Sequence, residues 1–133
     1  MQLPALFEER MHHMLPPEEY EKFLRSYERE QYHALRVNTL KLTGDAFRKR
    51  GLFTLEPVPW CENGFYYGEE ERPGKHPFHE AGLYYIQEPS AMSAAALAGV
   101  RPGDYVLDLC AAPGGKSTQL AAALQGEVLL FSN

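Results

Sequence analysis

Apolar residues recur every three or four positions up to Tyr27, which is the spacing of one face of a helix. The first set ends before the pair Pro16-Pro17 and consists of Leu3, Leu6, Phe7, Met11 and Met14. The second set follows that pair and consists of Tyr20, Phe23, Leu24 and Tyr27. Pro17 suits the first position of a helix, where its missing N–H needs no partner. We therefore predict two amphipathic helices whose apolar stripes face a core.

The apolar period changes to two between residues 35 and 40, which predicts a short strand. Thr43 can cap a following helix, and Gly51 can end it. Asn63-Gly64 is a turn signal between strand candidates. Further strands are expected at residues 52–57, 65–67 and 83–86.

The last third of the chain has the pattern of an α/β unit. An alanine-rich stretch at residues 90–97 predicts a helix that packs tightly against a sheet. Apolar runs at residues 105–109 and 127–131 predict two buried strands, and a helix is expected between them over residues 119–124. This order predicts two parallel strands joined by a crossover helix. The fold class is therefore α/β.

A tight loop of small residues joins the first of these strands to its helix. A phosphate-binding P-loop would need glycine at position 110, which is Cys110, and Pro113 removes one backbone N–H. A nucleoside-binding loop needs an acid, here Asp108, followed by small residues at positions 110, 112 and 114. The spacing favours a nucleoside cofactor, while a nucleotide triphosphate site and a purely structural turn remain open.

The residue identities in the loop are more specific than the spacing of its small residues. It reads Asp108-Leu-Cys-Ala-Ala-Pro-Gly-Gly-Lys-Ser-Thr and resembles the S-adenosylmethionine loop of the Sun/RsmF-like RNA cytosine-5 methyltransferases, closest to their ribosomal RNA branch. Residues 35–41, 58–61 and 85–92 resemble that family in the same order. The resemblance implies that S-adenosylmethionine contacts Cys110, Ala111, Ala112, Pro113, Gly114, Gly115 and Lys116.

The resemblance also implies a division of the chain. Residues 1–80 would form an accessory region, helical and then α+β, that positions RNA. Residues 81–133 would begin a Rossmann-like methyltransferase domain, truncated after its second strand. In that family the nucleophilic cysteine lies well downstream of the loop, so we expect no catalytic residue in this chain and read Cys110 as a loop residue. The alternative is a non-catalytic RNA-binding or scaffolding fragment with a vestigial cofactor loop.

The net charge of −5 does not favour nucleic-acid binding, but the charge is uneven. Residues 1–50 carry nine Lys/Arg against eight Asp/Glu, whereas residues 51–90 carry two against seven. If RNA touches this piece, the candidate contacts are Arg36, Lys41 and Arg48-Lys49-Arg50. Exposed aromatic rings also stack on RNA bases, but core packing is favoured over stacking for Trp60, Tyr66, Tyr67, Tyr84 and Tyr85.

Composition places the protein among soluble globular chains. The first ten residues contain an acidic pair where a signal peptide needs an apolar run, and no segment has the uninterrupted apolar length of a membrane span. We therefore expect a cytoplasmic protein that does not bind a membrane. His76, His79 and Cys61 lack the paired spacing of zinc sites, so no metal is expected.

Overall fold

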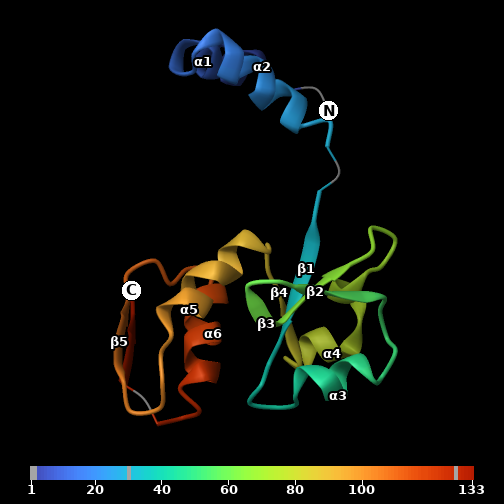
Figure 1. Cartoon of the computed structure of the whole chain (residues 1–133), viewed down its shortest axis with the longest axis vertical. Coiled ribbons are helices and arrows are strands. Elements are labelled where there is room, and N and C mark those ends of the chain that lie inside the picture. Colours follow the sequence, from blue (N-terminus) through green and yellow to red (C-terminus); the bar gives the residue numbers. More distant parts are fainter. Residues whose placement is uncertain (1–2, 30, 128) are drawn as a thin grey trace. The chain divides into compact units, whose positions relative to one another are not determined.

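The computed structural model describes residues 3–29, 31–127 and 129–133 (Figure 1). It divides into two compact units, Met1–Gln31 and Tyr32–Asn133. The first unit is a pair of helices, and the second contains two sheets. The predicted mixed α/β class is confirmed.

The two predicted N-terminal helices are present as α1 (Ala5–Met14) and α2 (Pro17–Ser26). Their apolar stripes contact each other, with the Phe7 and Phe23 ring centroids 6.0 Å apart. Neither helix has a buried residue within this unit, so the core-facing role of the two stripes stays a prediction. Two helices of ten residues each have too little surface to enclose a core.

The second unit begins with a four-stranded antiparallel sheet, here called the accessory sheet. Its spatial order is β2-β3-β1-β4. The strands are β1 (His33–Val37), β2 (Leu55–Val58), β3 (Cys61–Tyr67) and β4 (Tyr84–Ile86). Because β4 pairs with β1, residues 84–86 belong to this sheet, and the domain boundary near residue 80 stays a prediction.

Short helices complete the core on one face of the accessory sheet (Figure 1). The Thr43 hydroxyl caps α3 (Gly44–Arg48) as predicted, accepting from the Ala46 N–H at 3.2 Å. The elements η1 (Pro73–Lys75) and α4 (Pro77–Glu80) follow β3. The buried cluster consists of Leu35, Val37, Phe47, Phe65 and Tyr84.

The Asn63-Gly64 pair does not form the predicted turn. Strand β3 runs through it, and the chain reverses instead at Pro59-Trp60, between β2 and β3. A Cβ on Gly64 would lie 2.7 Å from the Met92 sulfur and 3.1 Å from the Cys61 Cβ. Gly64 therefore marks a close approach between the sheet and the segment after β4, not a turn.

The remaining elements form the predicted α/β unit. The alanine-rich segment is η2 (Ser90–Met92) followed by α5 (Ser93–Ala98), and Gly99 ends it with a φ of 60°. Strands β5 (Tyr105–Asp108) and β6 (Leu129–Ser132) are parallel, as predicted. Helix α6 (Gly115–Ala123) begins four residues before the expected Gln119, because Gly114 adopts a φ of 112° and lets the chain turn early.

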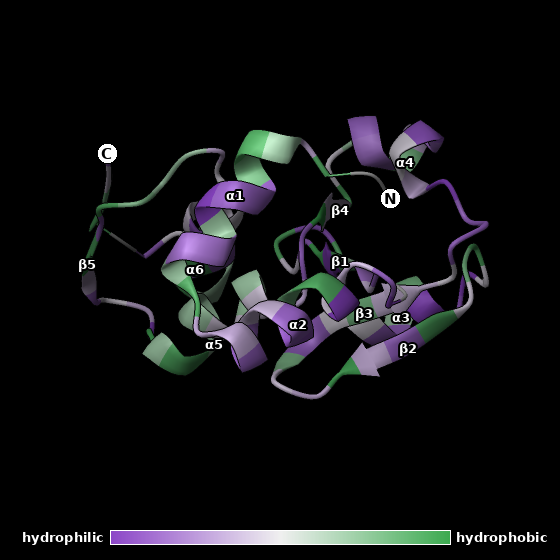
Figure 2. Cartoon of the chain, turned by 90° about the horizontal axis from the view of Figure 1, so that it is seen from above, coloured by the Kyte–Doolittle hydropathy of each residue, from purple (hydrophilic) through white to green (hydrophobic). Residues whose placement is uncertain are grey.

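One face of the β5-β6 pair is open. Tyr105 is 82% exposed, and four more large apolar side chains of this segment are also exposed, namely Leu107, Leu109, Leu129 and Phe131. Much of the β5 segment is coloured as hydrophobic in Figure 2. The opposite face packs against α6.

We predict that Gly64→Ala destabilises the protein by about 1–3 kcal/mol, because the new methyl group forces Met92 and Cys61 apart in a packed site. Gly68→Ala is the matched control, since a Cβ there meets nothing within 4 Å. Urea unfolding followed by circular dichroism measures both. Equal midpoints for the two variants would contradict the close approach.

Candidate functional site

Asp108, at the end of β5, organises the loop that follows it. One carboxylate oxygen accepts the Cys110 N–H at 3.0 Å, and the other accepts the Ser117 hydroxyl at 2.6 Å. Only 7% of the residue surface is exposed. These two hydrogen bonds, that of Ser117 first, hold the pKa of the Asp108 carboxyl below its usual range. The acid therefore closes the loop by joining its two ends.

The loop itself presents its small residues at the surface. Cys110, Ala112 and Pro113 are exposed, and Gly114 and Gly115 are half-buried. The Gly114 N–H donates to the Ala111 carbonyl at 2.6 Å. A Cβ on Gly114 would meet nothing within 4 Å, so the space beside this glycine is open to a ligand. The structure thus brings together the seven residues, Cys110 to Lys116, that the resemblance assigns to the cofactor.

The N-terminus of α6 follows directly and is a favourable place for negative charge. No side chain caps it within the described residues, and Gly114 occupies the N-cap position. The first N–H groups of a helix point outward and carry the positive end of its dipole. A carboxylate or phosphate group fits this position. Lys116, half-buried in the first turn, adds a cation.

Arg36 connects the accessory sheet to this helix. It is 4% exposed, which makes the predicted RNA contact through Arg36 wrong. Its Nε donates to Gln87 Oε1 at 2.9 Å, and its Nη2 donates to the Gly115 carbonyl at 3.1 Å and to the Thr118 hydroxyl at 2.9 Å. Burial lowers the pKa of the guanidinium from its usual value. The side chain therefore hydrogen-bonds to α6 and to the residue that follows β4.

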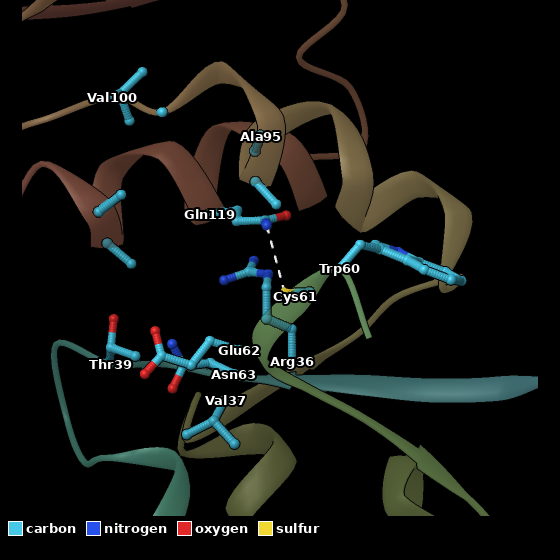
Figure 3. A pocket seen from close by; sticks show the side chains of 14 residues that line it. Arg36, Val37, Thr39, Trp60, Cys61, Glu62, Asn63, Ala95, Val100 and Gln119 are labelled. Atoms are coloured by element: carbon cyan, nitrogen blue, oxygen red, sulfur yellow. Dashed lines mark hydrogen bonds between the residues drawn. The ribbon is translucent and has the colours of Figure 1, made fainter. Parts of the chain in front are cut away.

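A second polar link lies beside Arg36. Gln119 of α6 donates through Nε2 to the Met92 carbonyl at 3.0 Å and to the Cys61 sulfur at 3.7 Å (Figure 3). A cavity of about 360 Å³ lies between the sheet and the helices at this point, and Arg36 and Gln119 line it. Cys61 is buried, and this burial raises the pKa of its thiol. The thiol is therefore less readily ionised than that of an exposed cysteine.

The other four predicted RNA contacts lie in the second unit, and three of them contact neighbouring groups. Lys41 donates to the Ala81 carbonyl. The Arg48 and Arg50 guanidinium carbons lie 5.9 and 5.5 Å from the Phe65 and Phe78 ring centroids. Lys49 is exposed.

The five aromatic residues considered for base stacking differ in how far they are buried. Tyr84 is buried and its hydroxyl donates to the Pro73 carbonyl at 2.7 Å, which confirms core packing. Tyr66, Tyr67 and Tyr85 are half-buried. Trp60 is 42% exposed, with its indole N–H donating to the Pro89 carbonyl at 2.8 Å. Trp60 therefore offers the largest exposed ring surface of the five.

Among the residues with described positions, no three His, Cys, Asp or Glu side chains gather as a metal site would require. Likewise, no helix in the described ranges is both long and apolar enough to cross a membrane.

Sequence reasoning missed four side chains that shape the site: Ser117, Gln87, Thr118 and Gln119. Ser117 could have been found, because it lies nine residues from Asp108 within one motif. The others act across sequence separations of 27 to 82 residues, which no local pattern encodes.

Comparison with known proteins identifies relatives along the whole chain. A model of the N-terminal domain of 16S rRNA methyltransferase RsmF matches residues 3–89. Ribosomal RNA small subunit methyltransferase F of Shewanella baltica is 40% identical over 126 aligned residues, covering 85% of this chain and 26% of the relative. The protein of the same name from Vibrio parahaemolyticus is 39% identical and covers 98% of this chain and 29% of the relative.

A solved structure has the same fold. The crystal structure of a methyltransferase homologue from Pyrococcus horikoshii superposes with a TM-score of 0.78 at 31% identity. The match covers 98% of this chain and 44% of that one. The chain thus spans between a quarter and a third of the length of the two bacterial relatives.

We predict that Ser117→Ala raises the pKa of Asp108 toward its usual value, because the variant loses the strongest hydrogen bond to the carboxylate. A carboxyl whose folded-state pKa is lowered stabilises the protein above its unfolded pKa of about 4, and this contribution is lost as the pH falls through the folded pKa. The variant should therefore lose less stability on acidification. Carbon-13 titration of the Asp108 carboxyl measures the pKa.

Ser93→Ala is the control for this prediction, since the Ser93 hydroxyl also donates a short-range hydrogen bond, to the Ser90 carbonyl, but away from Asp108. An unchanged Asp108 pKa in Ser117→Ala would show that the hydroxyl does not hold the carboxylate.

Proposed function

Because the chain belongs to the family of the N-terminal domain of 16S ribosomal RNA methyltransferase RsmF, we propose that it is the N-terminal part of a cytosine-5 methyltransferase acting on ribosomal RNA. Its methyl donor is S-adenosylmethionine. The names of the relatives support the reaction and the substrate class, and the loop after β5 supports the donor. The Rossmann-like sheet would begin with β5 and β6, and the enzyme would work in the cytoplasm.

The observation that carries the proposal is the open space beside Gly114 at an uncapped helix N-terminus. The cofactor has an anionic carboxylate on its methionine part, and the first N–H groups of α6 suit that charge. Exposed Cys110, Ala112 and Pro113 let the backbone approach a bulky ligand closely. The residues present therefore fit the cofactor.

Asp108 would act on the loop and not on the ligand. Both of its carboxylate oxygens are engaged, one by Cys110 and one by Ser117. Its role is to fix the curve of the loop so that Cys110 to Lys116 line one side of the ligand. When bound, S-adenosylmethionine supplies an electrophilic methyl group.

Methylation of cytosine also needs a cysteine thiolate that adds to carbon 6 of the base and makes carbon 5 nucleophilic. We assign that role to no residue of this chain. Cys61 is buried, and Cys110 lies within the cofactor loop itself. The target base would be unpaired or flipped out to reach the methyl group.

The accessory region would help to position the RNA. Arg36 is excluded from that task by its burial. The exposed ring of Trp60 is suited to touch a base, and four exposed cations are suited to touch phosphate, namely Lys41, Arg48, Lys49 and Arg50.

The donor site is tested by calorimetric titration with S-adenosylhomocysteine. We expect micromolar binding to the chain, weakened about tenfold or more by Gly114→Ala, because a side chain at a φ of 112° shifts the loop. Gly103→Ala is the matched control: it too has a positive φ, 93°, and open space at its Cβ, but it lies outside the loop. ATP should not bind.

Absence of binding by the unmodified chain would favour the vestigial loop of a non-catalytic RNA-binding fragment. Binding of ATP that is lost in Lys116→Ala would favour a phosphate-binding loop instead.

We further predict that the 133-residue chain transfers no methyl group to ribosomal RNA by itself, because it offers no exposed cysteine outside the cofactor loop. Incubation with RNA and methyl-labelled S-adenosylmethionine measures this. Label incorporated into RNA above the level of a heat-denatured sample would overturn the prediction.

A further inference from the structure

We propose that Arg36 is a positioning residue for the methyl-donor loop, and that its guanidinium holds the first turn of α6 in place from the accessory sheet. The role in donor binding rests on the proposed function, whereas the contacts between Arg36 and α6 do not depend on it. It assigns the accessory sheet a role in forming the donor site, in addition to any contact with RNA.

Arg36 is placed for this role by the sheet. In β1 it lies opposite Gly64 of β3 on one side and Tyr85 of β4 on the other. From there its guanidinium reaches two acceptors in the first turn of α6, the Gly115 carbonyl and the Thr118 hydroxyl. The planar fork of a guanidinium fixes the direction of several hydrogen bonds at once, so the contact sets both position and orientation.

Gln87 fixes the guanidinium in turn. Its Oε1 accepts from Arg36 Nε, so its amide nitrogen must point away from the cation. That nitrogen is buried and has no hydrogen-bond partner among the described residues. A Cβ on Gly115 would lie 3.3 Å from Gln87 and 3.3 Å from the Tyr85 ring. The start of α6 therefore packs closely against Tyr85 and Gln87, and a side chain at position 115 would have to push these two side chains aside.

Packing alone does not account for a cation in this position. None of the described hydrogen bonds of Arg36 goes to a carboxylate, so burial of its charge is offset by neutral acceptors only. Burying a charge without an opposite charge is costly, and an apolar side chain would fill the space more favourably. The directional hydrogen bonds are what an apolar side chain could not supply.

Gln119 provides a second anchor on the same helix. It lies one helical turn after Gly115 and binds the Met92 carbonyl and the Cys61 sulfur (Figure 3). Arg36 extends from the sheet to the helix, and Gln119 extends from the helix to Met92 and Cys61. Together these polar contacts prevent α6 from sliding along the sheet. The Gly114 end of the helix, where the ligand would bind, is then held still.

The first test needs no ligand. Amide hydrogen exchange of Thr118 and Gln119 in the 133-residue chain reports opening of the first turn of α6, and exchange of Tyr66 in β3 reports the sheet. We expect Arg36→Met to accelerate exchange at Thr118 and Gln119 roughly 10- to 100-fold more than at Tyr66. Arg36→Lys keeps the charge but not the fork, so its effect should be intermediate.

Lys75→Met is the control, because it removes an exposed cation from the same unit. It should leave all three amides unchanged. Equal acceleration at Thr118, Gln119 and Tyr66 in Arg36→Met would mean that Arg36 only contributes to global stability, and would overturn the proposal. If Arg36→Met does not fold, Thr118→Val removes one acceptor on the surface and should accelerate exchange at α6 alone. No change there would overturn the proposal equally.

The second test uses S-adenosylhomocysteine. Arg36→Met, at a temperature where it remains folded, should bind it about tenfold or more weakly than the unmodified chain, whereas Lys75→Met should bind it equally well. Unchanged affinity in Arg36→Met overturns the positioning role. If the unmodified chain does not bind the ligand, the donor site is refuted, and the exchange measurement still decides whether Arg36 orders α6.

Discussion

The contact between the buried Arg36 guanidinium and the first turn of α6 is the constraint that joins the two sheets of the second unit. Arg36 extends from a central strand of the antiparallel accessory sheet and contacts the helix that connects the two strands of the parallel sheet. A two-stranded parallel sheet has little stability by itself. Helix α6 packs on the β5-β6 pair on one side and is tied to the accessory sheet on the other.

The loop between β5 and α6 is held by a different set of hydrogen bonds. Asp108 joins the two ends of the loop through Cys110 and Ser117, without using any residue from the accessory sheet. Loop curvature is thus set locally, and the placement of α6 is set over a long range. The methyl-donor binding proposed above would need both, because the loop would supply the surface beside Gly114 and the helix its N-terminal N–H groups.

Local features were predictable from the sequence and long-range ones were not. The Thr43 cap, the Gly99 helix end, the parallel strands and the tight loop between β5 and α6 follow from patterns within a few residues of each other. The alternation in residues 35–40 predicted a strand but could not show that Arg36 is buried, because its partners lie 51, 79 and 82 residues away. Gly64 carried a turn signal in the sequence, yet its meaning depends on Met92, which the structure brings against it.

The anchoring of α6 bears on how the chain acquires its structure. All four strands of the accessory sheet are complete at Ile86, before any residue of β5 follows in the sequence. The antiparallel pairings join residues at most 51 positions apart, whereas α6 must close a loop of about eighty residues to reach Arg36. The accessory sheet therefore precedes the α/β unit in the chain, but its second buried cluster is completed by Met92, which follows β4. A fragment cut between β4 and η2 would remove Met92 from that cluster and would leave Arg36 without its two acceptors in α6.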